Sequence, residues 1–300
     1  MDLVLEPLGY PIFVRALIAA VLVGSVCAVV GTYVVLRGLA FIGDAIGHAA
    51  LPGVVVAFLL GAPFYLGAAV AAVGTALAIG FVTHRTTLRA DTTIGVLFAG
   101  TFALGIFLFS LIQGYVADLF SFLVGNILFI GFGDLVALLV IGGVVLLTIA
   151  ILWKELLYAT FDPLGAAASG LPVGRLEYLL LVLVALTVVI SVQAVGIILV
   201  VAMLVTPAAA AQLLTQRFGA LMALAIVFGV SGAVIGLYLS YWLDAASGAS
   251  IVLVETVLFV VAWAISTYRG RTRRRLAMAH SSTTNSLSIP TRGSGLGTSD

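Results

Sequence analysis

The sequence has 300 residues, of which 63% are hydrophobic and 8% are charged, and its mean hydropathy is +1.31. These values exceed what a soluble domain needs for its core, so the sequence predicts a polytopic membrane protein. The formal net charge is +1 and the positive charges are scattered over turns and one tail, so the charge gives no indication of nucleic-acid binding, and no nucleic-acid partner is expected. Cys27 is the single cysteine, which excludes a disulfide framework and a thiolate metal cluster.

The chain begins with MDLVLEPLGYPIFVR, which has neither a basic leader nor a small-residue cleavage site before its first apolar run. We therefore expect residues 1–11 to form an external N-terminal segment and the first helix to stay in the membrane. Residues 12–270 are expected to form one transmembrane domain.

A helix crosses a hydrocarbon core of about 30 Å with about twenty apolar residues. Nine such runs follow in chain order, at 12–36, 39–60, 63–83, 90–113, 132–157, 174–194, 196–215, 218–243 and 250–268. Several are joined by very short turns, so eight crossings with a broken or re-entrant helix remain an alternative. The predicted fold class is an all-α polytopic membrane protein.

Basic loop residues set the orientation, because Lys and Arg stay on the cytoplasmic side. Nine crossings with an external N-terminus and a cytoplasmic C-terminus place every basic residue except Arg15 on that side. We therefore expect a multi-pass protein of the cell membrane. His84, beside Arg85, is interpreted as a solvated residue of a cytoplasmic turn.

Three further segments lie outside the nine runs. Residues 115–130 are apolar but short, which favours an external interfacial or re-entrant helix. In residues 158–173, Asp162-Pro163 is a helix-start signal and Gly170-Leu171-Pro172 is a stop, so a short helix on the cytoplasmic face is expected. Residues 271–300 end in a Ser, Thr and Gly-rich stretch and are predicted to be a disordered cytoplasmic tail.

Asp44 and His48 are the most informative polar residues, since they lie four positions apart in an apolar run. On a helix their side chains share one face, so a carboxylate oxygen and an imidazole nitrogen can converge. This donor pair suits zinc, manganese or ferrous iron, and ionisable residues in membrane spans commonly mark ion pathways. Spacing alone leaves open that the two residues only hydrogen-bond each other. A two-fold dimer would bring four ligands to one axis.

Several chemistries are excluded or set aside. No P-loop motif occurs, so an ATP-driven step needs a separate subunit. Gly131-Phe132-Gly133-Asp134 matches the GxGD shape of intramembrane aspartyl proteases, but Asp134 falls at a helix start, where a capping role is expected. A secondary carrier that uses Asp44 and His48 as a proton relay is a further alternative.

Four stretches together resemble the permeases of ABC-type importers for zinc, manganese and iron, which are related to the vitamin B12 and iron-siderophore permeases. They are GTYVVLRGLAFIGDAIGHAALPGVVVAFLLG (31–61), DTTIGVLFAGTFALGIFL (91–108), FDPLGAAASGLPV (161–173) and VGIILVVAMLVTPAAAAQLL (195–214). The resemblance implies a type II importer fold that works as a homodimer with two cytoplasmic ATPase subunits. It implies no permanently bound cofactor and no enzymatic activity in this chain.

The resemblance also assigns roles to residues. It implies that Asp44 and His48 bind the transported zinc or manganese, with iron as a further candidate. The segment near 162–172 resembles the coupling helix that docks on the ATPase, which assigns that role to Asp162, Pro163, Ala166, Gly170 and Leu171. An extracytoplasmic metal-binding protein is expected to deliver the ion.

Overall fold

The computed structural model describes residues 6–112 and 127–286, with no description of the side chains of residues 129 and 270–286. Within these ranges the secondary structure is helical and contains no strand. Most of the interfacial helix predicted at 115–130 lies outside the described residues. Its end forms a short 3-10 turn, η2 (Ile127–Phe129), and another 3-10 turn, η1 (Pro7–Gly9), precedes the first helix.

Nine helices in the described part are long and apolar enough to cross a membrane, as the sequence predicts. They are α2 (Pro11–Leu36), α3 with α4 (Ile42–Ala49 and Leu51–Leu60), α5 (Phe64–Arg85), α6 (Ala90–Ser110), α8 (Phe132–Ile151), α11 (Val173–Val195), α12 (Ile197–Leu214), α13 (Phe218–Leu243) and the first part of α14 (Ser247–Ser286). The second crossing is divided at Ala50. Pro52 explains the division, because it has no N–H to donate to the carbonyl of His48 one turn earlier.

Two predicted boundaries are wrong. The run at 132–157 is not one helix, because α8 ends at Ile151 and α9 (Trp153–Phe161) begins after Leu152. The break coincides with Trp153 and Lys154, residue types that favour the membrane interface over the apolar core. The last helix continues past the predicted end at 268 to Ser286, since no proline lies between Arg269 and Ser286 and good helix formers do. Disorder of the tail stays a prediction for residues 287–300, which lie outside the described residues.

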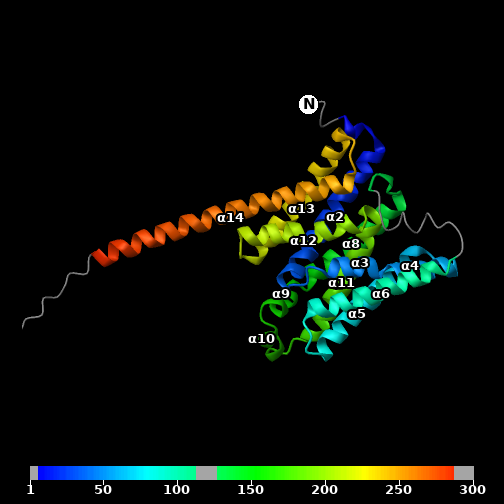
Figure 1. Ribbon diagram of the computed structural model, residues 1–300, viewed down its shortest axis with the longest axis horizontal. Helices are drawn as coiled ribbons and strands as arrows, with labels where there is room; N and C mark the ends of the chain where they lie inside the picture. The colour runs from blue at the N-terminus through cyan, green and yellow to red at the C-terminus, as the bar shows by residue number, and fades with distance from the viewer. Residues whose placement is uncertain (1–5, 113–126, 287–300) are drawn as a thin grey trace, which may run out of the picture.

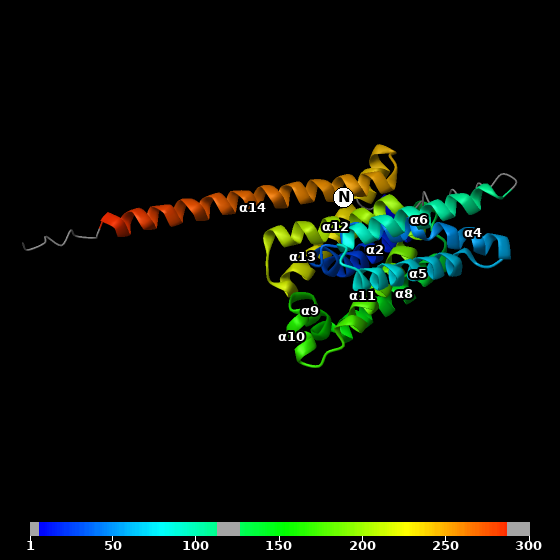
Figure 2. The same cartoon turned by 60° about the horizontal axis from the view of Figure 1, so that its bottom comes forward.

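The helices form two groups that meet along α11 (Figures 1 and 2). Helices α2, α12, α13 and α14 pack together as one group, while α4, α5 and α6 pack together as the other. Helix α3 lies between them and packs against α5, α6, α11 and α12. The far part of α14 leaves the body as a single long helix in both views.

Glycines let the helices of the first group approach closely. A Cβ on Gly24 of α2 would lie 3.0 Å from the carbonyl oxygen of Gly229 of α13. Gly31, two turns further along α2, faces the backbone of Leu204 in α12 with no room for a side chain. Small residues drive close packing where lipid removes the hydrophobic force between helices.

Side-chain contacts tie the helix ends at each side of the bundle. The Arg37 Nε donates a hydrogen bond to the Thr160 Oγ1 of α9 at 3.2 Å, at the end where α2 finishes. At the opposite end, the ring centroids of Phe13 and Tyr241 lie 5.5 Å apart. The alternating direction of the nine helices therefore gathers Arg37, Arg85, Arg89 and Arg175 at one end, the end expected to be cytoplasmic.

Candidate metal site and coupling segment

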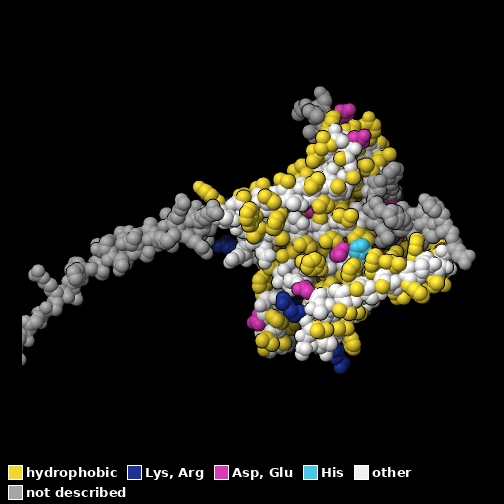
Figure 3. All heavy atoms as spheres, in the orientation of Figure 1, with side chains coloured by type: hydrophobic (Ala, Val, Ile, Leu, Met, Phe, Trp, Pro, Cys, Tyr) yellow, Lys and Arg dark blue, Asp and Glu magenta, His cyan; other side chains and the backbone are white. Residues whose placement is uncertain are grey.

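Asp44 and His48 project from one face of α3, as their spacing predicts. The Asp44 Oδ1 lies 3.3 Å from the His48 Nε2, and the two side chains are 41% and 29% exposed. Figure 3 shows a histidine side chain beside an acidic one on the surface over α3, among hydrophobic atoms. The pair thus presents one oxygen and one nitrogen donor toward the outside of this chain.

Two phenylalanines of α6 orient the imidazole of His48. Its ring centroid lies 5.5 Å from that of Phe98 and 5.0 Å from that of Phe102. The His48 Nδ1 is buried and has no hydrogen-bond partner among the described residues. Packing, more than hydrogen bonding, therefore directs Nε2 toward the carboxylate of Asp44.

The opposite face of α3 explains the depth of the pair. A Cβ on Gly43 would lie 2.8 Å from the side chain of Leu204, and one on Gly47 would lie 3.4 Å from Ile197 and 3.7 Å from Val188. Val188 lies well inside α11, far from the start of that helix at Val173. The glycines bring α3 against the interior helices, so Asp44 and His48, although Asp44 lies in the first turn of α3, are level with Leu204 and Val188 within α12 and α11.

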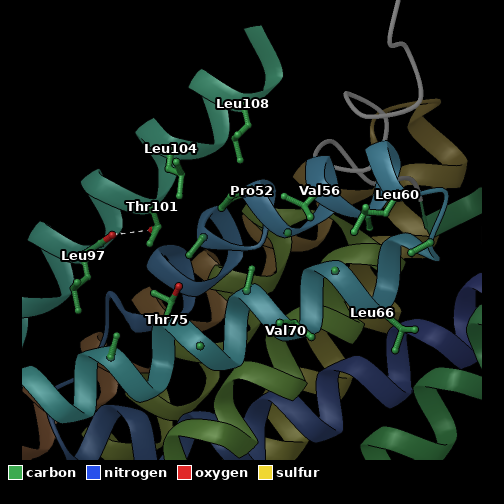
Figure 4. A pocket seen from close by; sticks show the side chains of 18 residues that line it. Pro52, Val56, Leu60, Leu66, Val70, Thr75, Leu97, Thr101, Leu104 and Leu108 are labelled. Carbon is green, nitrogen blue, oxygen red and sulfur yellow. Dashed lines mark hydrogen bonds between the residues drawn. The ribbon is translucent and has the colours of Figure 1, made fainter. Parts of the chain in front are cut away.

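A groove of about 600 Å³ adjoins the pair, between α4, α5 and α6 (Figure 4). It starts at Ala49, next to His48, and its lining residues include no charged or imidazole side chain. Of its two threonines, Thr101 donates its hydroxyl to the carbonyl of Leu97 at 2.7 Å. The groove therefore offers no carboxylate or imidazole ligand to a cation, in contrast to Asp44 and His48.

One chain supplies too few ligands for a closed metal site. No group of three or more His, Cys, Asp or Glu side chains able to hold a metal occurs in the described part of the chain. Two ligands on a partly exposed face suit a transported ion, which must leave again. They also leave coordination positions for a second copy of the chain or for water.

The segment predicted to dock on the ATPase forms α10 (Pro163–Ala168) within the predicted bounds. Asp162 caps it, because its Oδ1 accepts from the Gly165 N–H at 2.8 Å. Ala166 lies on the buried face of this helix. Gly170 ends it with a φ of +88°, and the Leu171 N–H donates to the Ala166 carbonyl at 3.1 Å. These residues build the helix and hold it at the end of the bundle (Figure 1).

The model of the ABC 3 transport family matches residues 9–266 of the chain. The chain belongs to the ABC 3 transport family. The match spans eight crossings, most of the ninth and α10, and it leaves out the rest of α14 and the tail.

Relatives that match over most of their length support this family assignment. The chain is 48% identical over 263 residues to the manganese transport system membrane protein MntC of Halalkalibacterium halodurans, covering 88% of this chain and 90% of that protein. It is 41% identical over 261 residues to the chelated iron transport system membrane protein YfeD of Yersinia pestis, covering 87% and 88%. Among solved structures it resembles a chain of PsaBC from Streptococcus pneumoniae in complex with Fab, with a TM-score of 0.77, 38% identity and coverage of 87% and 94%.

Asp134 has a structural role in this ABC 3 family chain, as expected. It lies in the first turn of α8, where its Oδ2 accepts from the Gly131 N–H at 3.0 Å. Its Oδ1 accepts from the hydroxyl of Tyr65 in α5. Both oxygens are engaged at the end of the span, which agrees with the expected capping role of Asp134.

Sequence reasoning missed the residues of the coupling segment that face outward. Leu164 is 84% exposed on α10, and Phe161 just before it is also exposed. The sequence signal for this exposed surface was Leu164, a large apolar residue directly after the helix-start residues Asp162 and Pro163. Leu164 and Phe161 are thus accessible at this end of the bundle, whereas Ala166 is buried.

Proposed function

We propose that this ABC 3 family chain is the membrane permease of an ATP-driven importer for a divalent transition metal, with manganese as its cargo. The observation that carries the proposal is the convergence of the Asp44 Oδ1 and the His48 Nε2, 3.3 Å apart inside a span. Oxygen and imidazole donors suit manganese and ferrous iron, and they also accept zinc. The relatives described above are a manganese and a chelated iron transport protein, in that order of identity, which supports manganese first and iron second.

Binding at this site rests on two copies of the chain. Each copy contributes one carboxylate and one imidazole on an exposed face. A two-fold axis beside α3 brings the two ligands of each copy together, which gives four ligands in the dimer. When the metal ion binds, these carboxylate and imidazole groups replace some of its water ligands. Because the ligand set of either copy is incomplete, separation of the two faces releases the ion.

A separate ATPase drives that separation through α10. Leu164 and Phe161 supply an apolar contact surface at the end of the bundle, while the Asp162 cap and the Gly170 turn keep α10 compact. Helix α9 joins α10 to the body, and Thr160 of α9 accepts the hydrogen bond from Arg37 next to the start of α3. Motion of the ATPase thus has a short covalent and polar route to Asp44. A metal-binding protein delivers the ion at the opposite end.

Radioactive manganese uptake tests this proposal. The chain is expressed with its ATPase and binding protein in cells that lack their own manganese importer, and excess iron or zinc is added as competitor. We expect uptake that disappears when the Walker lysine of the ATPase is replaced, and we expect iron to compete better than zinc. Uptake that survives the Walker replacement and collapses with an uncoupler would instead identify a proton-coupled carrier.

A further inference from the structure

A second imidazole–carboxylate pair lies at the end of the bundle that carries α10. The His84 Nε2 at the end of α5 lies 3.1 Å from the Glu177 Oε2 near the start of α11, and the side chains are 40% and 31% exposed. The ring of Tyr178 lies against His84, with centroids 5.5 Å apart. The pair therefore joins two helices that are far apart in the sequence.

This pair repeats the chemistry of Asp44 and His48. In both, an Nε2 converges with one carboxylate oxygen at hydrogen-bond distance, an aromatic ring supports the imidazole, and both side chains are partly accessible. These are the two histidines whose side chains the structure describes. An imidazole and a carboxylate form a donor set for the same class of divalent ions.

Helix α11 gives the relative position of the two pairs. Gly47, next to His48, packs against Val188 of α11, and Glu177 lies eleven residues earlier on that helix. At the rise of an α-helix this is about 16 Å toward the end that holds α10. Helices α5 and α11 both pack against α3. An ion that leaves α3 in that direction therefore moves along the helices that carry the second pair.

The charge around the second pair favours weak binding. The guanidinium of Arg37 is close enough to Glu177 for the carboxylate to oppose the lowering of the Arg37 pKa that burial causes. The same positive charge repels a divalent cation. A site that must pass an ion to solution gains from this repulsion, since binding has to be weak enough to allow exit.

We propose that His84 and Glu177 form a second divalent-metal site, weaker than the first, which receives the ion on its way out of the permease. This inference rests on the proposed function. It adds a release step: the ion leaves Asp44 and His48, binds His84 and Glu177, and then becomes hydrated.

Titration of the purified permease–ATPase complex with Mn²⁺, followed by the EPR signal of the free ion, tests this inference. The variants are His84→Gln/Glu177→Gln, Asp44→Asn/His48→Gln and all four substitutions together. The paired amides keep a hydrogen bond between α5 and α11 while removing both ligands. The swap His84→Glu/Glu177→His keeps both donors and serves as the matched control.

We expect a tight and a weak class of bound Mn²⁺ in the unchanged complex. The glutamine pair weakens the weak class by about tenfold or more and leaves the tight class, whereas the swap keeps both classes. If His84→Gln/Glu177→Gln leaves the weak class of bound Mn²⁺ unchanged, the inference is overturned. If the weak class is lost in His84→Glu/Glu177→His as well, the inference is also overturned, and the two residues serve helix packing alone. If Asp44→Asn/His48→Gln leaves the tight class intact, the proposed function fails separately from the second site.

Discussion

Gly53 of α4 and Gly67 of α5 face each other so closely that a Cβ on either would overlap the carbonyl group of the other. This contact joins the two helices on either side of the turn at Gly61, which has a φ of +64°. It holds α4 in place directly after the short helix that carries Asp44 and His48. Close packing through small residues is what the glycine and alanine-rich stretch at 67–80 indicates.

Replacement of either glycine should destabilise the protein. For Gly53→Ala or Gly67→Ala we expect a loss of about 1–3 kcal/mol in the free energy of unfolding, because a methyl group forces two backbones apart. Unfolding in mixed detergent micelles measures it. Gly74→Ala on the same helix is the matched control, since nothing lies within 4 Å of its added Cβ. If Gly67→Ala and Gly74→Ala are equally stable, the backbones of α4 and α5 do not approach each other closely at Gly53 and Gly67.

The spans and α10 could be predicted because local signals fix them. Charged residues and glycines interrupt the apolar runs, Asp162-Pro163 starts α10, and Gly170 ends it. Asp44 and His48 could be paired for the same reason, since a helix converts a spacing of four into one face. Each of these features depends on residues within a few positions of one another.

Contacts between distant segments could not be predicted in this way. His84 is exposed, as its neighbour Arg85 suggests, but it lies in the last turn of α5 and Glu177 approaches it from another helix. The hydrogen bond from Arg37 to Thr160 is equally remote in sequence. A single sequence carries the helix periodicity but not the helix neighbours, so these partners appear only in the fold.

Replacement of Arg37 by lysine should make metal uptake depend on pH. Burial lowers the pKa of the Arg37 guanidinium, but arginine stays charged throughout the physiological range. Lysine starts from a lower pKa and burial lowers it further, so Arg37→Lys loses its charge as the pH rises. We expect its metal uptake to fall from about pH 6 to about pH 9 relative to the unchanged protein.

Exposed Arg89 at the same end provides the control for this substitution. Arg89→Lys should follow the pH profile of the unchanged protein, because a solvated lysine keeps its charge over this range. If Arg37→Lys also follows the pH profile of the unchanged protein, the charge of Arg37 is not needed for the coupling between α9 and α3.

Leu164 should be needed for assembly with the ATPase. For Leu164→Asp we expect loss of the ATPase from the purified complex with manganese binding at the permease kept, because a charge replaces the apolar contact of α10. Co-purification in detergent measures the association. Ile198→Asp is the matched control, since Ile198 is 82% exposed at the opposite end of the bundle. Loss of the ATPase in both variants would indicate general instability.

The face that carries His48 should meet a second copy. In a Cys27→Ala background, His48→Cys is expected to give cross-linked dimers with a short bifunctional thiol reagent, because equivalent residues approach each other across a two-fold axis. Val257→Cys, on an exposed face of α14, should give monomers. Cross-linking at Val257 but not at His48 would place the dimer interface elsewhere and leave the metal site with two protein ligands.

Pulsed EPR of Mn²⁺ bound to the permease–ATPase complex, at less than one ion per two chains, tests most directly whether Asp44 and His48 bind the cargo. We predict a nitrogen hyperfine coupling from the imidazole in the unchanged complex and in His84→Gln, and its loss in His48→Gln/His84→Gln, where the second imidazole is also removed. A nitrogen coupling that persists in the double variant, or that is absent from His84→Gln, would contradict direct binding of the ion by His48.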